Sequence, residues 1–178
     1  MTTTTIIRAD RPRIYVACLA AYNNGILHGA WIDATADAWT IWDGINAMLA
    51  ASPIAGAEEW AIHDYEGFGG VRIAEYTGIA RVAEIAGFLD DHGELGAALI
   101  GHFSGDVGEA REAMEERYLG VHASLADYVQ ELTEETTTIP HNLLYYIDYR
   151  AMARDAEMNG DLFTIETAHD EVHVFAGY

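Results

Sequence analysis

The chain has 178 residues, with 29 acidic side chains and nine basic ones, all of them arginine, which gives a formal net charge of −20. Such a charge repels phosphates and excludes non-specific binding to nucleic acid or to an anionic membrane. Hydrophobic residues make up 51% of the chain, which excludes a disordered acidic chain. The single cysteine, Cys18, excludes an internal disulfide, and no run approaches the ~20 apolar residues that span a membrane. We therefore expect a soluble, cytoplasmic protein.

Residues 1–61 predict a small α+β domain that opens with a strand. Residues 13–22 are β-branched, aromatic or small, which favours an extended chain. Asn24-Gly25 then predicts a tight hairpin turn, because both residue types tolerate positive φ, and residues 26–33 are expected to return as the second strand. Alternation within residues 59–65 predicts a third strand.

A helix is predicted between the second and third strands. Asp37 has the residue type and position of an N-cap, and Pro53 marks a point that the helix cannot pass. Apolar residues recur between these two positions at steps of three and four, which predicts one core-facing stripe: Trp39, Trp42, Ile45, Met48 and Leu49.

A helical domain is predicted for residues 62–105. Three glycines between Gly67 and Gly70 mark a break in the pattern. Asp90 to Gly93 is expected to end a first helix, and residues 95–103 predict a second, short one. The stripe of the first helix consists of Ile79, Val82, Ile85, Ala86 and Leu89.

Residues 106–178 predict a mixed α/β domain. Asn159-Gly160 is expected to stop its last helix, because glycine accepts the left-handed conformation of a helix C-terminus. The predicted helices cover residues 107–119, 125–132 and 140–158, and residues 162–166 and 172–175 predict a closing hairpin. The predicted fold class is therefore α+β, in three small domains.

The acidic residues are concentrated after Trp60. Up to that residue the chain has three arginines and six acids, a net charge of −3, whereas the remainder has six arginines and 23 acids, a net charge of −17. Like charges three or four residues apart on a helix cost roughly 0.2–0.5 kcal/mol per pair. Twelve acids at helical spacing form the candidate partner-binding surface: Asp90, Asp91, Glu94, Asp106, Glu109, Glu112, Glu115, Glu116, Asp127, Glu131, Glu134 and Glu135.

Four interpretations of this acidity are open. Composition alone favours solvated helix faces; a GC-rich genome would explain arginine without lysine, and salt adaptation favours acidic surfaces. The fourth interpretation is electrostatic imitation of DNA. B-DNA carries one charge per ~1.7 Å of axis, so 20 net charges match roughly 34 Å of duplex. Such a protein would occupy the basic groove of a DNA-binding enzyme, and salt would weaken the complex.

The sequence contains no convincing catalytic constellation. None of the eight histidines has the HExxH spacing of a zinc site, and no serine lies in a GxSxG elbow. His63 next to Asp64 and the pair His169 and His173 are the best local candidates. Residues four apart on a strand stand ~13 Å apart, however, which is too far for one ion. We therefore predict no catalytic residue, no metal and no cofactor.

Three separated motifs resemble ArdA-type antirestriction proteins. The first, within residues 14–34, contains IYVA, YNNG and GAWIDA. The second is EEWAIHDYEGF at residues 58–68. The third, residues 143–161, contains YIDY and NGD and resembles the antirestriction motif of the family. The resemblance extends from about residue 14 to about residue 175.

The resemblance implies a non-enzymatic protein of mobile elements or phage that inhibits type I restriction–modification enzymes by imitating bent B-DNA. It implies an elongated, curved homodimer of three small units that binds in the DNA groove of the methyltransferase core, and not to nucleic acid or membranes. The boundaries near Trp60 and Gly105 agree with three units. Carried over to this chain, the motif and dimer interface comprise Leu143, Leu144, Tyr146, Ile147, Asp148, Tyr149, Met152, Ala153, Arg154 and Asp155.

Alternatives from other functional classes make different predictions. A small metal-dependent hydrolase that uses carboxylates and histidines predicts a tightly bound metal. A salt-adapted protein of unrelated role predicts unfolding in low salt. For the third motif, an ordinary core-facing helix would explain the apolar residues equally well.

Overall fold

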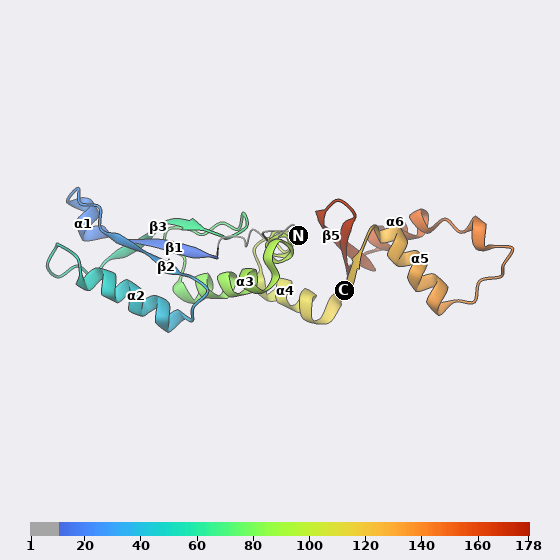
Figure 1. Ribbon diagram of the computed structural model, residues 1–178, viewed down its shortest axis with the longest axis horizontal. Coiled ribbons are helices and arrows are strands. Elements are labelled where there is room, and N and C mark those ends of the chain that lie inside the picture. Colours follow the sequence, from blue (N-terminus) through green and yellow to red (C-terminus); the bar gives the residue numbers. More distant parts are fainter. Residues whose placement is uncertain (1–10) are drawn as a thin grey trace, which may run out of the picture. The chain divides into compact units, whose positions relative to one another are not determined.

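The computed structural model describes residues 11–178, which divide into two compact units (Figure 1). The first unit ends at Val107, and the second comprises Gly108–Tyr178. The fold is α+β, with a three-stranded antiparallel sheet in each unit. No helix within residues 11–178 is both long enough and apolar enough to cross a membrane.

The first unit is built on a sheet with the strand order β2-β1-β3, formed by Gly29–Asp33, Arg13–Cys18 and Trp60–Glu66. Alternate residues of the central strand, Ile14, Val16 and Cys18, are buried because successive side chains of a strand point to opposite faces. The Cys18 Sγ lies 3.4 Å from the Ser52 Oγ and is closed off from solvent. β3 confirms the third predicted strand.

The tight hairpin predicted at Asn24-Gly25 is wrong. β1 runs directly into a helical turn, α1 (Leu19–Asn23), and β2 begins only at Gly29. Leucine and alanine favour a helical turn at this point, and the Asn24 side chain closes it by donating to the Ala20 carbonyl at 2.8 Å. Gly25 does adopt the positive φ expected of it, 75°, but in a longer connection.

Helix α2 (Ala38–Ala50) packs on this sheet and begins where it was predicted. The Asp37 carboxylate accepts a hydrogen bond from the Thr40 N–H at 2.9 Å. The predicted apolar stripe is only half right, because the buried residues of α2 are Ile41, Ile45 and Met48, whereas Trp39 and Trp42 are exposed. At 100° per residue, Trp39 lies about 150° around the helix from the centre of that buried face.

Helix α3 (Ile79–His102) completes the first unit. Its predicted stripe is confirmed, since Ile79, Val82, Ile85, Ala86 and Leu89 are all buried. The helix kinks at Gly93, where φ is 54° and ψ is −133°, a conformation that residues with a Cβ rarely adopt. The end predicted at Asp90 to Gly93 is therefore a kink between two helical segments.

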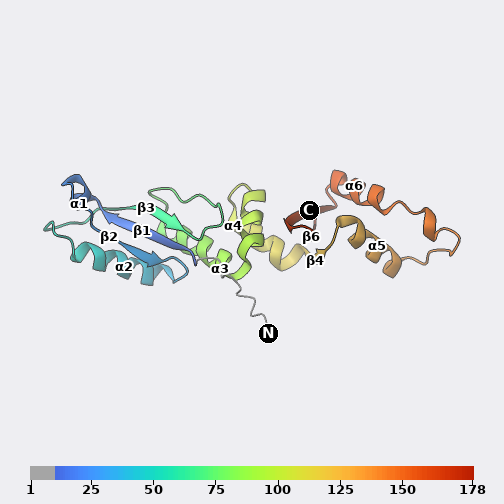
Figure 2. The ribbon, with the colours of Figure 1, turned by 45° about the horizontal axis from the view of Figure 1, so that its top comes forward.

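The second unit contains a sheet with the order β4-β6-β5, formed by Tyr118–His122, Glu171–Ala176 and Leu162–Ala168, and two helices, α5 (Leu125–Thr136) and α6 (Tyr149–Asn159) (Figure 2). Its small core joins Leu125, Val129, Ala153 and Val174. Its elements in chain order are α4 (Val107–Glu112), a π-helical turn (Ala113–Arg117), β4 (Tyr118–His122), α5 (Leu125–Thr136), a 3-10 turn (Leu144–Tyr146), α6 (Tyr149–Asn159), β5 (Leu162–Ala168) and β6 (Glu171–Ala176).

Two predicted helices of the second unit are wrong in extent. The helix expected over residues 107–119 stops at Arg117, and β4 follows at once, paired with β6. The helix expected over residues 140–158 is instead a 3-10 turn followed by α6, because the Asp148 carboxylate caps the Ala151 N–H at 3.0 Å and starts a new helix there. The stop at Gly160, where φ is 77°, and the closing hairpin of β5 and β6 are confirmed.

The three-domain division stays a prediction. β3 pairs with β1 across the boundary expected at residue 61, and residues 11–107 form one compact unit. The boundary expected after residue 105 lies two residues from the division observed at Val107. Residues 1–10 of the first predicted domain lie outside the described part.

Candidate partner-binding surfaces

The twelve predicted acids lie on the surfaces of the two units. Eleven are exposed and Glu109 is half-buried. Asp90, Asp91 and Glu94 flank the kink of α3; Asp106 lies just before α4; Glu109, Glu112, Glu115 and Glu116 lie on α4 and the π-helical turn; Asp127, Glu131, Glu134 and Glu135 lie on α5.

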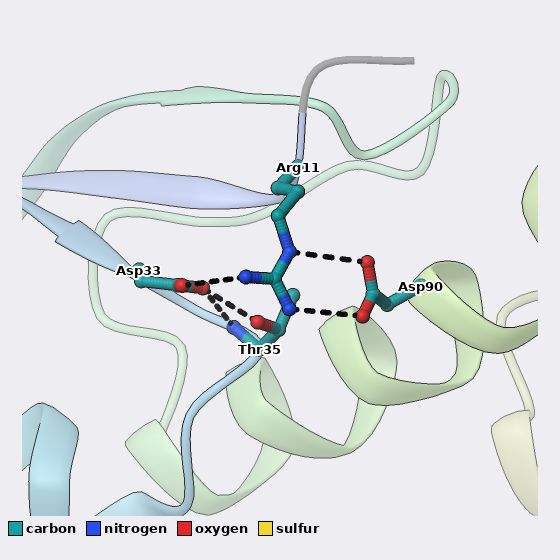
Figure 3. A network of polar contacts seen from close by, with 4 residues as sticks. All are labelled: Arg11, Asp33, Thr35 and Asp90. Atoms are coloured by element: carbon teal, nitrogen blue, oxygen red, sulfur yellow. Dashed lines mark hydrogen bonds and ion pairs between the residues drawn. The ribbon is translucent and has the colours of Figure 1, made fainter. Parts of the chain in front are cut away.

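Asp90 is partly neutralised by a residue that sequence spacing does not connect to it. The Arg11 guanidinium donates to both Asp90 oxygens, at 3.1 and 3.4 Å, and lies 3.5 Å from Asp33 (Figure 3). The Thr35 hydroxyl, donating to Asp33 at 2.6 Å, lowers the pKa of Asp33; its backbone N–H and Arg11 act in the same direction, and partial burial opposes them. These contacts join the segment before β1 to the end of β2 and to α3.

A buried arginine forms ion pairs with two of the acids of α4. Arg117, at the end of the π-helical turn, is only 8% exposed. Its Nη2 lies 3.6 Å from Glu109 and 3.9 Å from Glu112, and its guanidinium carbon lies 4.2 Å from the centre of the Tyr178 ring. The Tyr178 hydroxyl also donates to Glu109. This cluster therefore anchors two of the twelve carboxylates.

The acids of α5 are favourable at one end of the helix and unfavourable at the other. Ser124 and Asp127 cap the N-terminus, where the Asp127 N–H donates to Ser124 at 3.2 Å and negative charge is stabilising. Glu134 and Glu135 lie in the last turn, which contains no basic residue. Negative charge at a helix C-terminus is destabilised by the partial charge of the unpaired carbonyls. Glu134 accepts a hydrogen bond from the Gln130 amide at 2.8 Å. The negative charge of both glutamates nevertheless remains unfavourable at this end of α5.

The residues of the third motif separate into two groups. One group is explained by the fold: Asp148 caps α6, Ala153 is in the core, and Tyr149 packs against that core. Burial and the neighbouring Glu134 raise the pKa of Tyr149. Arg154 and Asp155 are exposed and lie 3.7 Å apart.

The other group of motif residues is apolar and largely exposed. Leu143, Leu144, Tyr146 and Met152 are exposed, with Tyr146 at 83%, and Ile147 is half-buried. Sequence reasoning missed Tyr145, exposed at 87%, and Met158, although both lie within the same motif. Their large apolar side chains within the same motif are the signal that could have identified them.

Neither histidines nor carboxylates converge on a catalytic or metal site within residues 11–178. No group of three or more His, Cys, Asp or Glu side chains in this range could hold a metal ion. His173 is hydrogen-bonded to Tyr118 at 2.8 Å and to Thr167 at 3.0 Å, whereas His169 pairs with Asp170. A cavity of about 680 Å³ in the first unit includes Arg72 and Arg81, and its described lining contains no carboxylate or histidine.

The comparison with known families gives a match over most of the chain. Residues 14–171 match the family model of the antirestriction protein ArdA. No curated protein matches the chain. The family match begins within the first strand and ends at the first residue of β6, so it includes the twelve acids and the third motif but not the last strand of the second sheet. The chain therefore belongs to the ArdA family of antirestriction proteins.

Proposed function

We propose that the protein is a DNA mimic that occupies the DNA groove of type I restriction–modification enzymes and so protects incoming mobile-element DNA. Membership in the ArdA family supports an antirestriction function, a non-catalytic inhibitor and an interaction with restriction–modification enzymes. Competition for the methyltransferase core, without chemistry, is the mechanism that we propose.

The observation that carries the proposal is the exposure of eleven of the twelve predicted carboxylates in a chain of net charge −20. Exposed carboxylates remain available to the arginines and lysines that normally contact phosphates. In the proposed complex the acids of α3, α4 and α5 take the place of DNA phosphates. Attraction over long range would also speed the encounter with a basic groove.

The placement of Glu134 and Glu135 adds a physical argument for selection by function. Each opposes the dipole of α5 at a cost of about 0.3–1 kcal/mol. A neutral residue at either position would remove this unfavourable charge, and glutamine at position 134 would keep an acceptor for the hydrogen bond that Gln130 donates. A binding surface that needs negative charge explains why acids stand there.

Homodimerisation through the second unit is part of the proposal. The exposed apolar residues Leu143, Leu144, Tyr146 and Met152 form a candidate interface. Small domains with small cores commonly gain stability by association. A curved dimer of three-domain chains would extend the acidic surface beyond the length of duplex that one chain can imitate.

Displacement of DNA tests the proposed function directly. A fluorescent cognate duplex bound to a type I enzyme should be released when the purified protein is added, and less completely as salt rises, because counterions screen the charges. Displacement that does not depend on salt, or no displacement at low salt, would contradict the proposal.

A matched charge variant locates the surface. Replacing Glu112, Glu115, Glu116 and Glu131 together by glutamine should weaken displacement strongly at low salt. The control replaces four acids outside the proposed surface, Glu58, Glu59, Asp64 and Glu75, by their amides, so the change in net charge is the same. Equal loss in both variants would show that net charge alone determines inhibition.

A further inference from the structure

Two tryptophans on α2 lie outside the buried face of that helix. Trp39 is 82% exposed and Trp42 is 40% exposed, whereas the face of α2 that packs on the sheet consists of Ile41, Ile45 and Met48. Large aromatic side chains are usually at least half-buried, because burial removes much apolar surface from water. Trp42 contacts Trp60 of β3 edge to face, with ring centres 5.4 Å apart. Trp39 is therefore the indole that calls for an explanation outside the fold.

The two tryptophans share a surface hollow with polar groups. A hollow of about 450 Å³ is lined by Ala38, Trp39, Trp42, Asp43 and Asn46. Positions 39, 42, 43 and 46 follow the spacing that places residues on one side of a helix. The hollow therefore combines two aromatic surfaces with a carboxylate and an amide. This combination suits a guanidinium, which stacks on aromatic rings and hydrogen-bonds to carboxylates.

The protein itself holds arginines with this chemistry at two other places. The guanidinium carbon of Arg13 lies 4.7 Å from the centre of the Trp31 ring, and its Nη2 lies 2.5 Å from Glu66. In the second unit, Arg117 lies over the ring of Tyr178 and beside Glu109. An aromatic ring together with a carboxylate therefore binds arginine twice in this fold.

The hollow on α2 has the same groups and no arginine of its own. Among residues 11–178, no ion pair or cation–π contact joins an arginine to Trp39, Trp42 or Asp43. The N-cap residue Asp37, two positions before Trp39, adds a second carboxylate. The hydrogen bond from the Thr40 N–H lowers the pKa of Asp37 and so favours its charged form. A cationic side chain from another molecule would complete the arrangement.

We propose that Trp39, Trp42 and Asp43 form a docking site for an arginine side chain of the partner protein. The identity of the partner rests on the proposed function, because a groove that binds DNA presents arginines to phosphates. Tryptophan and arginine are also the residue types most enriched among those that dominate interface energetics. The site would act as an apolar anchor within an interface that is otherwise electrostatic.

The first experiment tests the site without the partner enzyme. N-acetyl-arginine methylamide is titrated into the whole protein while the tryptophan indole N–H signals are followed by NMR, with assignments from Trp39→Phe and Trp42→Phe. The signals of Trp39 and Trp42 should shift with the arginine compound and move much less with N-acetyl-lysine methylamide at equal ionic strength, because ammonium stacks poorly. Absence of a shift, or equal shifts with both compounds, would overturn the proposal.

The second experiment tests the anchor in the complex. Trp39→Ala should weaken DNA displacement from a type I enzyme at least about tenfold, and the loss should persist at high salt because stacking is not screened. Tyr76→Ala, which removes another exposed aromatic residue of the first unit, is the matched control and should leave displacement unchanged. Unchanged displacement by Trp39→Ala would overturn the partner contact.

The two experiments separate failure of this inference from failure of the proposed function. If the unaltered protein displaces no DNA, the proposed function fails, while the NMR titration still decides whether the hollow binds arginine. If the unaltered protein displaces DNA and Trp39→Ala does so equally well, only the docking site is wrong. Thermal unfolding followed by circular dichroism should confirm that the highly exposed Trp39 can be replaced without loss of the fold.

Discussion

The two units of the protein differ in how they distribute apolar residues. The first unit contains 22 of the 30 buried hydrophobic residues among those described, and the second contains eight in 71 residues. Exposed large hydrophobic residues show the opposite trend, with seven in the first unit and ten in the second. Fifteen acids and four arginines also give the second unit a net charge of −11. The second unit therefore has a small core and a large surface suited to contacts.

The largest expected effect tests how far the second unit depends on its few buried residues. Phe175 is fully buried and stacks on Phe163 with ring centres 4.8 Å apart. Phe175→Ala should cost about 3–5 kcal/mol, which is enough to unfold a unit with so few buried residues. Phe88→Ala removes a similarly buried ring from the first unit and should leave that unit folded at 25 °C. Urea denaturation with separate probes for each unit checks this difference, and equal sensitivity of both units would contradict it.

The next effect concerns the exposed apolar residues of the third motif. Leu143→Asp combined with Tyr146→Asp should raise the dimer dissociation constant at least about 30-fold, because both side chains would enter the proposed interface. Sedimentation velocity over a range of concentrations measures the change. Tyr76→Asp in the first unit is the control and should not alter association. A parent protein that stays monomeric at high concentration would refute the dimer.

A smaller effect sharpens the contrast between the two ends of α5. Glu134→Gln and Glu135→Gln should each stabilise the second unit by about 0.3–1 kcal/mol, because each removes a negative charge from the helix C-terminus. Asp127→Asn should have the opposite sign, since its charge lies at the N-terminus beside the Ser124 cap. The midpoint of urea unfolding reports both changes. Stabilisation by all three variants would point to general charge repulsion instead of the helix dipole.

The smallest expected effect is on the stability of the first unit at acidic pH. Because the pKa of Asp33 is lowered, chiefly by the Thr35 hydroxyl, the stability that this group provides is complete above its ordinary pKa of about 3.9. It is lost as pH falls through the lower value of the folded state. Asp33→Asn and Thr35→Ala should both flatten the pH dependence of unfolding below about pH 4. A profile as steep as that of the parent protein would exclude this source of acid sensitivity.

Local signals in the sequence predict much of the fold. The Asp37 cap, the apolar stripe of α3, the stop at Gly160 and the closing hairpin depend on side chains within a few residues. β4 was missed because its first two residues, Tyr118 and Leu119, continue the predicted helix, and only pairing with β6 fixes the segment as a strand. Similarly, Asp148 lies inside a continuous helical pattern in the sequence. The structure shows that it is an N-cap, because a 3-10 turn precedes it and α6 begins at the next residue.

The candidate surfaces could be predicted in composition but not in their contacts. Spacing in the sequence identifies the twelve acids, of which eleven are exposed, and their role in partner binding stays a prediction. The pairing of Arg11 with Asp90 joins residues 79 positions apart, so no local pattern contains it. For Trp39 the error is one of orientation. Spacing of three and four residues identifies a helix, but it does not decide which residues at the edge of the predicted stripe face the sheet.

The closed environment of Cys18 makes it a natural reporter for the first unit. It is the single thiol of the chain, it is fully buried in β1, and the second unit has none. A thiol reagent can therefore react only when the first unit opens, so the labelling rate measures its opening free energy in the intact protein. The chain also has no lysine, so amine-directed dyes leave its side chains unmodified. Opening of one unit can thus be timed without introducing any mutation.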